Sequence, residues 1–97
     1  MKELFLLAAL AGSPAWDQPI PTQYDHEPEQ PVTIWRTDHI DSFCQAPPGW
    51  RPVACSATAF RSCHIFLSPT YPPGIDEAVL LRHEKAHCAG WSSDHSS

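Results

Sequence analysis

Four cysteines in a chain of 97 residues limit what this sequence can fold into. A chain this short buries little apolar surface, and small exported domains compensate with disulfides. No Cys-x-x-Cys pair is present, so a zinc site made of four cysteines is the weaker alternative to two disulfides. Four cysteines allow three pairings. We favour Cys55–Cys63, between two expected strands, which leaves Cys44–Cys88.

The first 15 residues are typical of a secretory signal peptide. Lys2 makes the start weakly basic, residues 4–12 form a short apolar run, and Ser13, Pro14 and Ala15 supply small residues before a cleavage site. The apolar run is about nine residues long, and a helix that spans a bilayer needs roughly 20. The alternative is a short N-terminal core helix. We predict cleavage after Ala15 and export to the periplasm or the extracellular space, without stable membrane insertion of the mature chain.

The charge of the chain argues against nucleic acid as a partner. The formal net charge is −5, and the sequence contains no cluster of Lys and Arg that could neutralise phosphates. No basic amphipathic helix indicates a membrane surface either. Composition therefore predicts neither nucleic acid nor a membrane surface as a partner.

The mature chain is predicted to be one small α+β domain preceded by an arm. Residues 16–31 hold four prolines and no apolar periodicity, which favours an extended arm. Residues 32–97 form the domain, with strands expected at 32–36, 53–57 and 63–68, a short helix at 38–45 and a long helix at 75–89. We expect the strands to form a small antiparallel sheet, about three strands wide, packed on the long helix.

The long helix has an unusual inner face. Gly74 or Asp76 can begin it, and Gly90 can end it. At about 100° per residue, one face collects Val79, Leu80, His83 and His87. Histidines rarely occupy two successive turns of the inner face in a purely structural helix. This face is therefore a candidate site.

The pattern His-Glu-x-x-His, here His83 to His87, predicts a zinc site. Residues i and i+4 of a helix stand one above the other, so two imidazoles can bind one ion. Zinc lowers the pKa of a bound water towards about 7, and Glu84 would act as the general base that takes its proton. A catalytic zinc needs a third protein ligand, which we predict to be His95, with Asp94 as the substitute. The alternative is a histidine pair that binds no metal.

Tyr71 lies in the loop before the long helix and is a second candidate for chemistry. Its hydroxyl could stabilise a transition-state oxyanion. The alternative is a packing role, which is the more common use of a tyrosine in a small domain.

The stretch HEKAHCAGW, residues 83–91, resembles the active-site helix of zincin metallopeptidases. The resemblance implies a minimal zincin-like fold, zinc ligands at His83 and His87, and Glu84 as general base. The third histidine of the metzincin pattern would fall at Ser93, so the chain is not a standard metzincin. It is more similar to small exported bacterial proteins, often carried on conjugative plasmids or other mobile elements, in which His-Glu-x-x-His-Cys-x-Gly-Trp is followed by Asp-His.

Three functions follow from these observations. The first is a zinc metallopeptidase that hydrolyses peptide bonds through a metal-bound water. The second is a non-catalytic exported module, stabilised by one zinc and two disulfides, that binds a partner in an envelope or conjugation assembly. The third, a small secreted inhibitor or toxin-like scaffold, rests on size and cysteine count alone. Glu84 discriminates between the first two, because a structural zinc site needs no carboxylate there.

Overall fold

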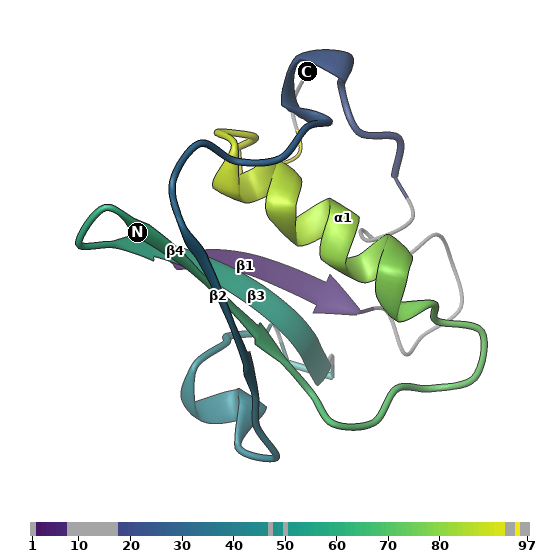
Figure 1. Cartoon of the computed structure of the whole chain (residues 1–97). Coiled ribbons are helices and arrows are strands. Elements are labelled where there is room, and N and C mark those ends of the chain that lie inside the picture. The colour runs from purple at the N-terminus through teal and green to yellow at the C-terminus, as the bar shows by residue number, and fades with distance from the viewer. Residues whose placement is uncertain (1, 8–17, 47, 50, 93–94, 96–97) are drawn as a thin grey trace.

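The computed structural model describes residues 2–7 (backbone only), 18–46, 48–49, 51–92 and 95, and the structural statements below concern these residues. They form a small α+β fold whose elements are β1 (Lys2–Leu7), the 3₁₀ turn η2 (Thr22–Tyr24), β2 (Val32–Arg36), the 3₁₀ turn η3 (Ile40–Ser42), β3 (Arg51–Ala59), β4 (Ser62–Leu67) and α1 (Glu77–Cys88). Helix α1 lies over one face of the sheet, and the segment around η3 lies on the other face (Figure 1). The strand at 32–36 and the long helix are thus confirmed, whereas the short helix expected at 38–45 is a single 3₁₀ turn.

The sheet is mixed, not antiparallel as predicted. Strands β3 and β4 form an antiparallel hairpin, and β2 pairs with β4 in the parallel direction. Together they make a three-strand mixed sheet, to which β1 adds along the free side of β3, in the order β1-β3-β4-β2. The prediction was wrong because the connection over residues 37–50, which contains η3, is long enough to pass β4 and bring β3 to its far side.

The disulfides join Cys44 to Cys55 and Cys63 to Cys88, so the predicted pairing Cys55–Cys63 and Cys44–Cys88 is wrong. The physical reason is the register of the hairpin. Residues Phe60 and Arg61 form its two-residue turn, both with positive φ, and this register sets Cys63 opposite Thr58. Because Cys55 lies three residues from Thr58 and side chains alternate between faces, Cys55 and Cys63 point to opposite faces of the sheet.

Each face of the sheet carries its own apolar cluster, and each cluster contains one disulfide. The larger cluster lies between the sheet and α1 and consists of Val53, Ala54, Cys63, Ile65, Leu67, Leu80 and Cys88. The smaller one lies under η3 and consists of Ile40, Cys44 and Cys55, with Phe66 packed against it. A chain with so little apolar surface therefore stabilises both clusters with a covalent link.

The arm was predicted over residues 16–31, of which 16 and 17 lie outside the described residues. Residues 18–31 contain no helix or strand other than the single turn η2. The arm crosses the C-terminal half of α1 (Figure 1). Two ion pairs and one hydrogen bond join it to the helix: Asp25–Arg82, Glu27–Lys85 and Gln30–Cys88. These pairs are exposed or half-buried, so they position the arm more than they stabilise the fold.

Strand β1 lies within the predicted signal peptide. The structure is that of the uncleaved chain, so cleavage after Ala15 stays a prediction. Over the described ranges, no helix has both the length and the apolar character to span a bilayer. The two disulfides favour an oxidising, non-cytoplasmic environment.

Candidate metal centre

The two ends of α1 are fixed by local hydrogen bonds. Asp76 caps the helix, since its Oδ1 accepts from the backbone N–H of Ala78 at 2.9 Å. At the other end Gly90 adopts a φ of +117°, its N–H donates to the His87 carbonyl, and the N–H of Trp91 donates to the Ala86 carbonyl. These two bonds make a Schellman motif, which requires a residue that tolerates positive φ. The chain therefore reverses immediately after the second histidine.

The reversal brings His95 back to His83 and His87. The Nε2 atom of His83 lies 3.1 Å from Nε2 of His95 and 3.1 Å from Nε2 of His87. The Nε2 atoms of His87 and His95 lie 3.2 Å apart. A tetrahedral zinc with Zn–N bonds of about 2.05 Å holds its nitrogen ligands about 3.3 Å apart. The three nitrogens thus converge at a spacing that suits one metal ion, and the cluster can hold one.

Trp91 fixes the orientation of His87. The Nδ1 atom of His87 lies 2.9 Å from the Trp91 carbonyl oxygen, to which it can donate only when it carries the proton. That tautomer leaves the lone pair on Nε2, which is the atom that faces the other two histidines. The indole of Trp91 is 1% exposed and stacks on the His87 ring, with centroids 4.9 Å apart. The Gly-Trp pair therefore both turns the chain and positions a ligand.

Glu84 is completely buried, with 0% of its surface exposed. It stands one residue after His83, in the same row of the helix as Leu80 and Cys88, which belong to the core between α1 and the sheet. A carboxylate with no contact with bulk solvent is costly unless it meets a cation or hydrogen-bond donors. Glu84 directly follows His83 in the helix, so a cation bound at His83 would offset part of this cost.

Burial changes the protonation of the two helical histidines. Burial is the main cause of the lowered pKa of His83, which is about 2, and the nearby His87 and His95 lower this pKa further. Burial also lowers the pKa of His87 to about 4, against the opposing effect of the Trp91 carbonyl. Both rings are therefore neutral at physiological pH, which is the form that binds a metal.

These shifts predict how the metal-free protein responds to acid. The folded-state pKa values of His83 and His87 lie below the unfolded value of about 6.5, so the unfolded chain binds protons more readily. We expect the urea midpoint of the chelated protein to fall steadily from pH 6.5 to pH 4.5. The zinc-loaded protein serves as the control and should resist over the upper part of that range. An equal midpoint at pH 7 and pH 5 in the chelated protein would contradict the shifts.

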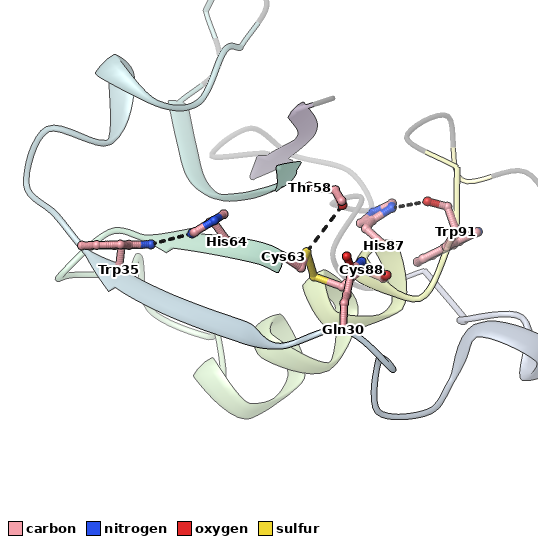
Figure 2. The surroundings of a disulfide bond; sticks show 8 residues. All are labelled: Gln30, Trp35, Thr58, Cys63, His64, His87, Cys88 and Trp91. Carbon is pink, nitrogen blue, oxygen red and sulfur yellow. Dashed lines mark hydrogen bonds between the residues drawn. A yellow bond between two sulfur atoms is a disulfide. The ribbon is translucent and has the colours of Figure 1, made fainter. Parts of the chain in front are cut away.

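The disulfide Cys63–Cys88 lies next to His87, the second histidine of the cluster (Figure 2). Cys88 follows His87 in the sequence, and the bond ties the last turn of α1 to β4. Thr58 of the neighbouring strand contacts the Cys63 sulfur from its hydroxyl at 4.0 Å. The position of the second ligand is thus linked covalently to the sheet.

Removing this disulfide should affect metal binding more than removing the other one. The double variant Cys63→Ser/Cys88→Ser frees the helix end that carries His87, whereas Cys44→Ser/Cys55→Ser frees the segment around η3 on the opposite face. Loop entropy predicts a similar loss of stability for both, about 3 kcal/mol each. Calorimetric zinc titration should therefore show weaker binding in the first variant at a temperature where both are folded. Equal affinities would show that the link plays no part in positioning the ligands.

The structure brings together three of the predicted site residues, His83, His87 and His95. Glu84 follows His83 directly in the helix. Asp94, the substitute ligand, lies outside the described residues. Tyr71 does not join the cluster, because its hydroxyl donates to Glu77 Oε1 at 2.8 Å, at the first turn of α1 and about 9 Å along the helix axis from His83. A role for Tyr71 in oxyanion stabilisation gains no support from this position.

Sequence reasoning missed two contributions to the site. One is the Trp91 carbonyl, a backbone group that no residue pattern identifies. The other is the arm, which reaches the end of α1 at Gln30 and brings the ring of Tyr24 close to Gly90. Acidic residues in the arm and basic residues on the outer face of the helix were a readable signal for that contact.

No protein-family model, no curated protein and no solved structure matches this chain. The site is therefore interpreted from its own geometry.

Proposed function

We propose that this protein is an exported zinc-dependent hydrolase that cleaves peptide bonds, with His83, His87 and His95 as ligands and Glu84 as general base. The observation that carries the proposal is the convergence of three imidazole nitrogens at mutual distances of 3.1–3.2 Å, with a buried carboxylate on the same helix. The resemblance of residues 83–91 to the zincin active-site helix supports the same function.

Three histidines leave one position of a tetrahedral ion for water or substrate, which is the arrangement of catalytic zinc sites. When bound, zinc would lower the pKa of a coordinated water and polarise the scissile carbonyl. Glu84 would accept the proton of that water and pass it to the leaving amine. His87 is held in the required tautomer by Trp91.

Access to the site is expected from the side of His95. His83 and His87 are 1% and 4% exposed, and Trp91 closes the site behind them, whereas His95 is half-buried. An extended peptide would therefore approach past His95. Because the domain is small, the walls of a substrate cleft are short, which favours broad specificity or a partner that supplies it.

Zinc-dependent cleavage of a mixed peptide library tests the proposal. The zinc-loaded protein should hydrolyse members of the library, and a chelator should abolish that activity. Cleavage that survives complete removal of the metal would contradict the proposed chemistry.

A second function is favoured by the complete burial of Glu84. A carboxylate at 0% exposure has no contact with solvent water in this structure. The alternative is therefore a non-catalytic exported module in which zinc and two disulfides maintain the shape and a surface binds a partner in an envelope or conjugation assembly. Substitution of Glu84 separates the two functions.

A further inference from the structure

Strand β2 forms one edge of the sheet. Among the described residues it pairs with β4 and with no other strand. The Pro31 carbonyl accepts from Cys63 N–H, and the Thr37 N–H donates to the Leu67 carbonyl. In a parallel pair, alternate residues bond to the neighbour, so odd positions of this strand face β4. The N–H and C=O groups of Val32, Ile34 and Arg36 therefore point outward.

This edge also carries exposed apolar side chains. Ile34 is 42% exposed and Trp35 is 49% exposed, on opposite faces of the sheet. Trp35 is held in place, because its indole N–H donates to Nδ1 of His64 at 3.1 Å (Figure 2). Arg36 is paired with Glu77 of α1. A pre-ordered strand whose outward N–H and C=O groups pair with no described strand, and which contains no lysine or proline, is a template for a further strand.

We propose that β2 pairs antiparallel with β2 of a second copy of this chain, across a two-fold axis at Ile34. In this register Ile34 lies opposite Ile34 of the second copy, Val32 opposite Arg36, and Thr33 opposite Trp35. The outward residues at positions 32, 34 and 36 then form three hydrogen-bonded pairs, or about six backbone hydrogen bonds. The two sheets become one continuous sheet with a closed, isologous contact.

The sequence VTIWR is self-complementary in this register and not in its neighbours. An axis at Thr33 or at Trp35 leaves one outward residue beyond the overlap and so loses hydrogen bonds. The axis at Ile34 sets no like charges opposite each other, because the two Arg36 residues lie at opposite ends of the paired strands. In this register the Ile34 side chain of one copy packs against Ile34 of the other, and the exposed indole of Trp35 packs against the methyl group of Thr33. These features favour a second copy over an unrelated extended peptide.

The test uses Ile34→Lys, with Val79→Lys as the matched control. Val79 is 40% exposed, and it lies about 160° around α1 from Glu77, the residue that faces β2. Sedimentation equilibrium should show a wild-type dimer and at least a tenfold weaker association in Ile34→Lys, since two lysines would then face each other. Val79→Lys should associate like wild type. A monomeric wild type, or equal weakening by both variants, would overturn the proposal.

A charge-swap experiment tests the register itself. Ile34→Lys and Ile34→Glu should each be monomeric, and their mixture should form a heterodimer, because only an axis at position 34 sets this residue against itself. Hydrogen exchange should show that the Ile34 amide becomes protected in the dimer. Failure of the mixture to associate excludes this register. A monomeric wild type whose Ile34 amide is protected by a foreign peptide would show that the edge takes a different occupant.

Discussion

Replacing Glu84 with Gln is expected to lower the rate of peptide hydrolysis by about two to four orders of magnitude, the usual contribution of a general base. Gln has the same shape as Glu and cannot accept the proton of the attacking water. Because Glu84 is fully enclosed and is not one of the three ligands, the variant should keep one equivalent of zinc and a similar melting temperature. The measurement is the initial rate on a quenched fluorescent peptide with zinc content determined on the same sample.

Glu77→Gln is the matched control for this substitution. Glu77 lies on the same helix, but it is bound to Arg36 and Tyr71 away from the cluster. It should lose some stability and retain activity. If Glu84→Gln cleaves peptides as fast as the wild type, the hydrolase proposal fails and the non-catalytic module takes its place.

Replacing His83 with Ala is expected to remove the zinc. One of the three nitrogens is lost, and even the loss of an outer hydrogen-bond partner of a ligand costs about 10–100-fold in metal affinity, so a larger loss is expected here. Elemental analysis of the purified, oxidised wild type should give one zinc per chain, and the variant should give none after dialysis. Because metal binding contributes to folding stability, the melting temperature should fall as well.

His26→Ala controls for a general loss of histidines, since His26 is exposed on the arm and takes no part in the cluster. It should retain its zinc. A wild-type protein without metal, or a full equivalent of zinc retained by His83→Ala, would disprove the site.

The helix and its histidines were predictable because their signals are local. Asp76, Gly90 and the His-Glu-x-x-His spacing act within a few residues of one another, and the structure confirms the cap and the terminator. Of the predicted inner face, Leu80, His83 and His87 are buried, whereas Val79 is 40% exposed because it lies at the edge of that face. His95 was predictable from the reversal that Gly90 permits. This part of the site was therefore predictable from residues that are close to one another in the sequence.

The disulfide pairing and the strand order were not predictable, because both depend on distant parts of the chain. The faces of Cys55 and Cys63 follow from the hairpin register, and the turn at Phe60 and Arg61 has neither the Gly nor the Asn that usually marks such a turn. A shift of one residue would have reversed the face of each cysteine. The parallel pairing of β2 depends on the side of β4 at which β3 is added, which no local pattern determines.

The bond between Cys63 and Cys88 has a consequence for the order in which the protein matures. As the chain leaves the ribosome its thiols are reduced, and the segment that carries the second imidazole is not yet attached to the sheet. Oxidation would then fix the position of His87, and the three-histidine centre would be completed in an oxidising compartment. Under the proposed hydrolase function, the chain would stay inactive until its thiols are oxidised.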